Sequence, residues 1–422
     1  MALVIAVLVA VDDPGTLTGP RHATGSEDGS TTSLSAADVG VIARRVERLR
    51  QLRFLHPVRP RFVSRTEAVR LFGQSSSKEY PPRQQAIDSE ELKLVGLIRP
   101  DVDIGKVVGT IATEQVLGFY DDRSKRLVVV RDPASRRSLL EITLAHELVH
   151  ALEDQRFHFG KRGGLDDDEA IGEEALAEGS ATIVMSEYAD RFLGGGDLLD
   201  VAVDASSGGD TKLPPYIENL LLFPYEVGEG FVETFRGESG SWRAVDQVYR
   251  LRRPSSAEQV LHPELYAIDD KPRHVTVKDV GRRLGAGWKR VDSSSVGEFE
   301  LRMLFKIVGG RPAPAAAKGW GGGRFELWRR QEVPGACAAP CLARDVAIMR
   351  FAWDTARDRI EAERRLPRVF EHGLKGRRAA SRPGVALWLS RGGAIAMAGH
   401  VRETTIVFAP SAQAAARLLR SS

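Results

Sequence analysis

The sequence has few cysteines, little net charge and no apolar run long enough to cross a membrane. Only two of its 422 residues are cysteines, Cys337 and Cys341. Two thiols are too few for a structural zinc site, so this pair either forms a small disulfide loop or stays free. We favour the disulfide, which an oxidising compartment would promote. The formal net charge of +3, with no basic stripe interleaved with aromatic residues, gives no indication of a nucleic-acid partner.

The amino terminus carries a short apolar segment. Residues 2–11 form an unbroken apolar run, which is the length of a signal-peptide core and too short to span a bilayer. No basic residue precedes this run, so we interpret residues 1–12 as a truncated signal peptide; the alternative is a buried strand or a frayed end. We therefore expect an extracytoplasmic protein, secreted or associated with the envelope through this terminus. Residues 13–35, rich in Gly, Ser, Thr and Asp, predict a flexible linker.

The rest of the chain is long enough for two domains, which we place at residues 36–280 and 281–422. At the start of the first domain, apolar periodicity predicts a helix from Ala36. A short strand at 56–64 follows, then a short helix that ends at Gly73. Polar and proline-containing sequence, without a predicted element, continues to about residue 90.

The second domain is predicted to be a smaller α+β domain with an antiparallel sheet. Residues 296–310 predict a helix, residues 319–330 a glycine turn that enters a strand, and residues 345–366 a strand followed by a helix. Residues 385–410 predict two more strands, and a short helix closes the chain. The glycines at 319–323 lack the strand-to-helix context of a nucleotide-binding loop, so this domain suggests no chemistry of its own.

Three elements near the middle of the chain are predicted with the clearest patterns. Residues 118–130 read as a β-hairpin with an aromatic strand, a polar turn and a β-branched return strand. Residues 135–157 read as a long helix, and residues 168–190 as a second helix. The whole chain is thus predicted to belong to the α+β class.

The sequence HELVH, residues 146–150, carries the chemistry. Residues four apart lie on one face of a helix, so His146 and His150 can bind a single ion, which predicts a Zn²⁺ site. Zinc that keeps one open position lowers the pKa of a bound water, and Glu147 beside it can accept the water's proton. The alternative is two solvent-facing histidines on an ordinary helix.

The third ligand is predicted to be a carboxylate on the second helix, since no third histidine follows in the HExxHxxGxxH spacing. The candidates are Glu173, Glu174 and Glu178. We favour Glu178, because the small residues 179–181 after it would let this helix approach the zinc helix closely. Glu174, one turn earlier on the same face, is the reserve choice, and solvated acids on a charged face are the alternative for Glu173 and Glu174.

These motifs resemble a known family. HELVHALEDQ (146–155) followed later by ALAEGSA (175–181) is similar to the gluzincins, and more closely to poorly characterised exported zinc metallopeptidases of the peptidase-MA-like and haloarchaeal surface-protein kinds. The resemblance extends over further segments, which are GFYDDRSKRLVVV (118–130), FPYEVGEGFV (223–232), PSSAEQVLHPELY (254–266) and AKGWGGGRFELW (317–328).

The resemblance implies a zincin-like domain in which His146, His150 and Glu178 hold zinc and Glu147 is the base and proton shuttle. It also implies that the 118–130 hairpin forms an edge strand along which a peptide or protein substrate would lie.

The resemblance also implies polar residues that orient the ligands, and the chain departs from it there. Thermolysin-like enzymes carry Asp where this chain has Thr182, and the close family favours an acid at Ser180 and Gln at Glu153. Asp154 and Gln155 are the candidate substitutes for these orienting contacts.

A donor for the oxyanion is also needed, and the sequence offers two candidates. Tyr225 and His262 stand in the motifs at 223–232 and 254–266. The alternatives are that Tyr225 caps a packed helix and that His262 ends a helix begun by Ser255.

Two functional classes follow from these patterns. The first is an active zinc peptidase, and the second is a catalytically inactive envelope protein that keeps the zincin fold for a structural or binding role. Retention of Glu147 favours the first class, because a structural site needs no base.

Overall fold

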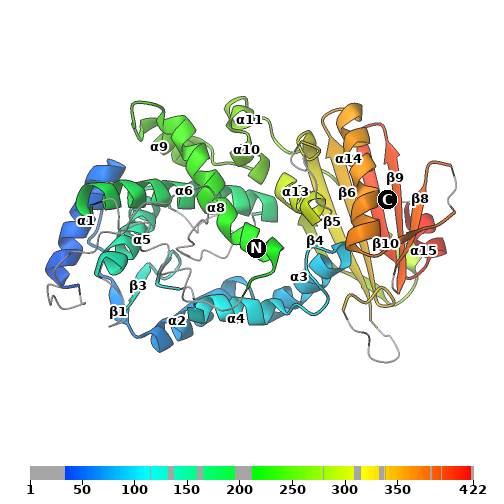
Figure 1. Ribbon diagram of the computed structural model, residues 1–422, viewed down its shortest axis with the longest axis horizontal. Coiled ribbons are helices and arrows are strands. Elements are labelled where there is room, and N and C mark those ends of the chain that lie inside the picture. The colour runs from blue at the N-terminus through cyan, green and yellow to red at the C-terminus, as the bar shows by residue number, and fades with distance from the viewer. Residues whose placement is uncertain are drawn as a thin grey trace, which may run out of the picture.

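The computed structural model describes most of the chain, in the ranges 34–114, 116–131, 137–158, 165–194, 212–278, 280–307, 315–331, 337, 339–380, 383–390 and 392–419. The predicted signal peptide and nearly all of the predicted linker lie outside these residues. Helices gather at one end of the molecule and a large sheet stands at the other (Figure 1). This supports the predicted α+β class, with the antiparallel sheet in the carboxyl-terminal region.

The first helices are longer and more numerous than the sequence predicted. They are α1 (Ala36–Arg50), α2 (Arg65–Glu79), α3 (Pro82–Val95) and α4 (Ile104–Glu114). The predicted end of α2 at Gly73 is wrong, because this glycine has φ in the helical range and Phe72 and Ser76 are buried on either side of it.

The prediction of irregular sequence before residue 90 is also wrong. Pro82 stands in the first turn of α3, where a proline starts a helix instead of breaking one. The helix then buries Ile87 and Leu94 on one face and ends at Gly96, whose φ of 84° is accessible to glycine.

A small three-stranded sheet follows in the chain. Its strands are β1 (Arg61–Val63), β2 (Gly118–Asp121) and β3 (Arg126–Val130), in the order β1-β3-β2. β2 and β3 are antiparallel and form the predicted hairpin, while β1 is parallel to β3. β2 is therefore an edge strand of this sheet.

Three long helices, followed by the nine-residue α9, carry most of the remaining helical part. They are α5 (Arg137–Phe157), α6 (Asp167–Phe192), α8 (Pro215–Arg236) and α9 (Arg243–Leu251). The predicted helices at 135–157 and 168–190 are confirmed as α5 and α6. Shorter helices lead to the sheet, namely α10 (Ala257–Leu261), α11 (Pro263–Ala267), α12 (Gly281–Leu284) and α13 (Glu298–Ile307).

Helices α6 and α8 pack backbone to backbone. A Cβ atom at Gly228 would lie 2.0 Å from the carbonyl oxygen of Ala175, and one at Gly179 would lie 2.2 Å from the main chain of Gly228. The small residue Gly179 therefore faces α8. The expectation that Gly179 faces the zinc helix was therefore wrong.

The large sheet has seven antiparallel strands in the order β4-β5-β6-β10-β9-β8-β7. Its strands are β4 (Trp288–Ser295), β5 (Trp320–Arg330), β6 (Asp345–Trp353), β7 (Arg377–Arg378), β8 (Ala386–Ser390), β9 (Gly393–His400) and β10 (Glu403–Ala409). The carboxyl-terminal region thus has three strands within 385–410, where two were predicted. Helix α14 (Ala356–Arg368) with the π-helical turn η1 (Val369–Gly373), and helix α15 (Ala412–Leu419), cover the sheet.

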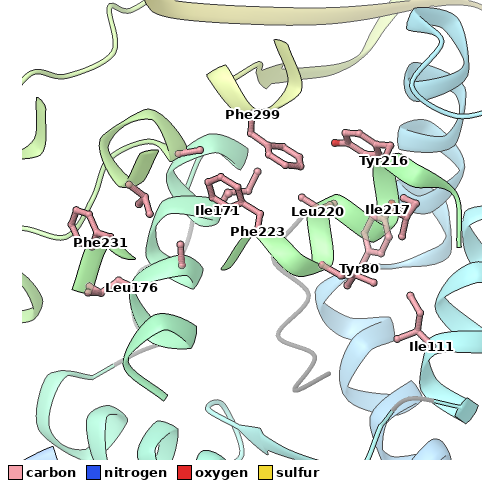
Figure 2. Close-up of a cluster of buried hydrophobic side chains, with 14 of the residues drawn as sticks. Tyr80, Ile111, Ile171, Leu176, Tyr216, Ile217, Leu220, Phe223, Phe231 and Phe299 are labelled. Atoms are coloured by element: carbon pink, nitrogen blue, oxygen red, sulfur yellow. The ribbon is translucent and has the colours of Figure 1, made fainter. Parts of the chain in front are cut away.

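One apolar core runs from the helices into one face of the large sheet. Figure 2 shows its central part, where Phe223 of α8 packs against Phe299 of α13 close to Ile171 of α6. A second cluster lies between the sheet and α15 and contains Val346. Among the residues that the structure describes, no helix is long and apolar enough to cross a membrane.

Candidate metal centre

Three predicted ligands meet at one point. The Nε2 atom of His146 lies 3.1 Å from Oε2 of Glu178 and 3.1 Å from Nε2 of His150, and His150 Nε2 lies 3.4 Å from Oε1 of Glu178. Helix α5 supplies both histidines from successive turns, and α6 supplies the glutamate. All three side chains are buried, with 6% exposure or less.

These distances suit a tetrahedral metal ion. Ligand atoms about 2.0–2.1 Å from a tetrahedral zinc lie about 3.3 Å from one another. The three nitrogen and oxygen contacts are within a few tenths of an ångström of that value. Among the described residues, His146, His150 and Glu178 form the group whose ligand atoms converge closely enough to hold a metal ion.

The charges of Glu178 and His150 stabilise each other in this buried site. Burial alone would raise the pKa of Glu178, but His150 and His146 outweigh it and lower the pKa to about 2. Burial likewise opposes the charged form of His150, whose pKa is nonetheless raised to about 9, chiefly by Glu178. Without a metal the cluster therefore keeps a proton, which a bound cation would displace.

Glu147 is placed beside the ligands with one free oxygen. Its side chain is 1% exposed, and Oε1 has no hydrogen-bond partner among the described residues. The main-chain N–H of Tyr120 on β2 donates to the carboxylate. Burial raises the pKa of Glu147 above its ordinary value, which favours proton acceptance near neutral pH.

The edge strand β2 lies directly against the ligand helix. Gly118 makes this contact possible, because a Cβ atom there would lie 3.0 Å from Cγ2 of Thr143 on α5. Farther along, the carboxylate of Asp154 accepts hydrogen bonds from the hydroxyl of Tyr120 and the ammonium of Lys125. The hairpin is thus fixed to both ends of the helix segment that carries the histidines.

Tyr225 is brought to the metal centre. Its ring lies 6.2 Å from the ring of His146 at an interplanar angle of 25°. Tyr225 lies within α8, one turn before the close contact of Gly228 with α6. The alternative that it caps a helix is wrong, because α8 continues to Arg236.

His262 belongs to a different cluster. It is the C-cap residue of α10, which agrees with the alternative that it ends a helix, although that helix begins after Ser256 and not after Ser255. Its Nε2 atom lies 3.1 Å from Glu298 and 3.3 Å from the guanidinium of Arg302. The described contacts of His262 do not join it to His146, His150 or Glu178.

The two other glutamates that were candidates for the third ligand, Glu173 and Glu174, have other surroundings. Glu173 pairs with the guanidinium of Arg253 at 3.1 Å and is not part of the converging set of ligand atoms. Glu174 is half-buried one turn before Glu178, and burial together with the charge of Glu178 raises its pKa to about 8. Glu174 therefore lies near the cluster without being part of the converging set.

The predicted substitutes for the orienting contacts do not act as such. Asp154 uses Oδ2 for the hairpin, and its Oδ1 has no hydrogen-bond partner among the described residues. The amide of Gln155 binds the main chain of Leu55 and His56. In the described part of the chain, Nδ1 of His146 is likewise without a partner.

A buried polar network behind α5 was not predicted from the sequence. Glu153 accepts from the guanidinium of Arg50 at 2.6 Å and from the hydroxyl of Tyr249 at 2.8 Å. That hydroxyl also lies 3.0 Å from Oγ of Ser180. Tyr249 thus links Glu153 on α5 to Ser180 on α6. In the sequence, only one feature pointed to Arg50. It is a charged residue directly after Leu49, the last apolar residue on the buried face of α1.

The two cysteines form a disulfide, as favoured from the sequence. It lies just before β6, where the main-chain N–H of Cys341 donates to the buried carboxylate of Glu90 on α3. The disulfide therefore stands at a contact between the helical part and the large sheet.

Comparison with known proteins gives one match. No curated protein and no solved structure matches the chain. The model of a protein family described as Domain of unknown function (DUF8575) matches residues 282–419, which contain all seven strands of the large sheet together with α13, α14 and α15 and exclude the metal centre. The carboxyl-terminal part of the chain is therefore similar to a domain family without an assigned function.

Proposed function

We propose that this protein is a zinc-dependent peptidase whose ligands are His146, His150 and Glu178. The observation that carries the proposal is the convergence of two imidazole nitrogens and a carboxylate at 3.1–3.4 Å next to a buried glutamate with a free oxygen. Two histidines and one carboxylate are the ligand set of catalytic zinc sites that leave a fourth position open. The disulfide agrees with an extracytoplasmic location.

Each residue of the centre has a role in this proposal. Zinc bound by the three ligands would act as a Lewis acid and lower the pKa of water. Glu147 accepts a proton at its free Oε1 and returns it to the leaving amine. Tyr225, whose ring lies 6.2 Å from that of His146, would donate its hydroxyl to developing negative charge. The main chain of the edge strand β2 would pair with an extended peptide.

The alternative is an inactive zincin-like protein in which the metal is structural. The observation that favours it is burial, since the three ligands and Glu147 are each 6% exposed or less. A structural ion contributes directly to folding, so its removal should unfold the protein or sharply lower its melting temperature. A catalytic ion should be removable with loss of peptide cleavage while the fold persists.

The first test is Glu147→Gln, which keeps the shape of the side chain and removes the base. We expect kcat/KM for peptide cleavage to fall by about 10²–10⁴ with zinc content unchanged. Elemental analysis and a peptide-library assay measure the two quantities on the same samples. Cleavage at the wild-type rate in this variant would remove Glu147 from the mechanism, and a wild type that binds zinc but cleaves no peptide would favour the structural role.

The second test compares two glutamates one turn apart on α6. Glu178→Ala should weaken zinc binding by more than roughly 100-fold, since residues that merely orient ligands already cost 10–100-fold. Glu174→Ala is the matched control and should keep one zinc per chain. Loss of zinc in Glu174→Ala alone would move the third ligand to that residue.

A further inference from the structure

Helix α14 lies across one face of the large sheet (Figure 1) and carries a row of arginines on its outer side. Leu366 is buried on the inner side of the helix, whereas Arg357, Arg364 and Arg368 are exposed. These arginines are 7 and 4 residues apart, so they form one basic ridge opposite the buried side. Within the described part of the chain, none of their guanidinium groups has an ion-pair or hydrogen-bond partner.

Two further basic residues lie at the carboxyl end of this ridge. The main-chain N–H of Gly376 donates to the carbonyl oxygen of Phe370 at 2.7 Å, so the chain folds back onto η1 and leaves Lys375 exposed. The guanidinium of Arg378 lies 5.8 Å from the ring of Trp388, which in turn packs 4.9 Å from the ring of Phe370. Lys375 and Arg378 therefore extend the basic ridge beyond the end of α14.

The charge of this segment is not balanced by acids. Residues 364–378 contain six arginines and lysines and one acid, Glu371, which gives a formal charge of +5 against +3 for the whole chain. The carboxylate of Glu371 accepts a hydrogen bond from the indole N–H of Trp388. Glu361 is the exposed acid of α14 itself. The rest of the chain is thus slightly negative, and the positive charge of the molecule is concentrated here.

An exposed valine lies beside the amino-terminal half of α14. Val401, in the two-residue turn between β9 and β10, is 65% exposed and has a φ of 51°. Such turns usually place glycine or asparagine at positive φ, and a β-branched residue adopts it only with strain. The carbonyl oxygen of Val401 accepts from the guanidinium of Arg359 at 3.1 Å, and the neighbouring Ile360 is 41% exposed. Folding favours neither the strain nor the exposure of Val401, which points to a contact outside the chain.

We propose that this face of the protein binds the surface of a membrane that contains anionic phospholipids. The guanidinium groups of the basic ridge would bind phosphate oxygens of the lipid headgroups. The side chains of Val401 and Ile360 would enter the boundary between headgroups and acyl chains. A soluble polyanion would use the arginines but offers nothing to these apolar side chains, so a lipid surface fits the combination better. The proposal does not depend on the peptidase function.

The test measures cosedimentation of the full-length wild-type protein with lipid vesicles. One set of vesicles is phosphatidylcholine alone, and the other contains about 30% phosphatidylglycerol. Any binding through the apolar residues 2–11 is measured by the first set. We expect at least about tenfold tighter binding to the anionic vesicles, with this preference lost when salt is raised from about 0.1 M to 1 M. Equal binding to both sets, or no binding, would overturn the proposal.

A double variant locates the surface. Arg364→Gln combined with Arg368→Gln should weaken binding to the anionic vesicles by about tenfold or more, because each basic side chain near such a surface contributes. Arg44→Gln combined with Arg48→Gln is the matched control, since these arginines are also exposed and four residues apart, on α1. Equal losses in the two double variants would attribute binding to overall charge and contradict the assignment to α14.

Val401→Asn separates a membrane from a soluble polyanion. Asparagine tolerates the positive φ, so the variant should melt at a higher temperature than the wild type while its affinity for anionic vesicles falls severalfold. Binding of soluble polyphosphate should not change in this variant. Vesicle binding that is also unchanged in Val401→Asn, together with tight binding of polyphosphate to the wild type, would replace the membrane with a polyanion as the partner.

Discussion

At the scale of single residues, the orientation of the ligand helix depends on a charge pair that water does not reach. Arg50 and Glu153 are both fully buried, and the guanidinium of Arg50 also lies 2.9 Å from Asp246 and 4.2 Å from the ring of Trp242. Glu153 stands one turn after His150 on α5. Because a buried charge must keep its partners, this pair fixes α5 against α1 and α9.

Removing one member of the pair should therefore be costly. Glu153→Ala leaves Arg50 buried with one fewer acceptor, and we expect the free energy of unfolding to fall by about 3–5 kcal/mol in urea denaturation. Tyr249→Phe, which removes only the hydroxyl that donates to Glu153, should cost about 1–2 kcal/mol.

The control for this prediction is an exposed ion pair of the same chemistry. Arg70 pairs with Glu67 on the surface of α2, so Arg70→Ala should leave the unfolding curve nearly unchanged. A loss in Glu153→Ala no larger than in Arg70→Ala would contradict the assigned role of the buried pair.

Contacts between residues that are close along one helix can be predicted from the sequence. Contacts between residues that only the fold brings together cannot. His146 and His150 are four residues apart, so their convergence follows from helix geometry alone. Glu178 was favoured because small residues follow it, and the first of these, Gly179, faces α8 and not the zinc helix. Arg50 meets Glu153 across 103 residues, and no local spacing encodes such a contact.

At the scale of elements, the contact between α6 and α8 determines where Tyr225 stands. Gly228 has no room for a side chain, since its Cβ would meet the carbonyl oxygen of Ala175 at 2.0 Å. Main-chain atoms cannot turn aside as a flexible side chain can, so the two helices would have to separate. Tyr225, one turn away on α8, would then move from the ring of His146.

Two glycines on α8 provide the test of this contact. Gly228→Ala should destabilise the protein by about 1–3 kcal/mol and should also lower any peptidase activity. Gly230→Ala, two residues along, meets nothing within 4 Å and should be stabilising by about 0.5–1 kcal/mol, as alanine for glycine in an open helix position generally is. Thermal melts of the two variants measure these changes in stability. Equal changes in melting temperature would show that the contact at Gly228 is not tight.

Helices and strands with a regular apolar pattern were predicted correctly. A helix was missed where the effect of one residue depends on its position within the helix. The hairpin at 118–130 and the helices α5 and α6 follow from apolar spacing. Helix α3 was missed because Pro82 breaks a helix in its interior but favours one in its first turn, and the sequence alone does not say which applies.

At the scale of the whole molecule, buried acids collect where the helical part meets the large sheet. Asp168 on α6 and Glu258 on α10 are each 4% exposed, and the fully buried Glu298 begins α13. One apolar core continues across this boundary, so these carboxyls cannot reach water without separating the two parts. The stability of the molecule should therefore depend on their protonation.

The direction of this pH dependence is clearest for Glu258. Its pKa is raised to about 9, first by burial and then by the nearby Glu298, Asp354, Asp168 and Asp270. In the unfolded chain the same carboxyl has an ordinary pKa near 4.5. Between these values the folded state holds a proton that the unfolded state has lost, so its contribution to stability is greatest in acid and declines as the pH rises towards 9.

Glu258→Gln should remove this decline, because glutamine imitates the protonated carboxyl at every pH. We expect the variant to exceed the wild type in free energy of unfolding by at least about 2 kcal/mol at pH 8, with the difference vanishing near pH 4. Glu361→Gln, at an exposed residue of α14, should follow the wild-type curve throughout. Urea denaturation at a series of pH values measures all three proteins. A constant difference between Glu258→Gln and the wild type would attribute the effect to packing and not to charge, since packing does not titrate.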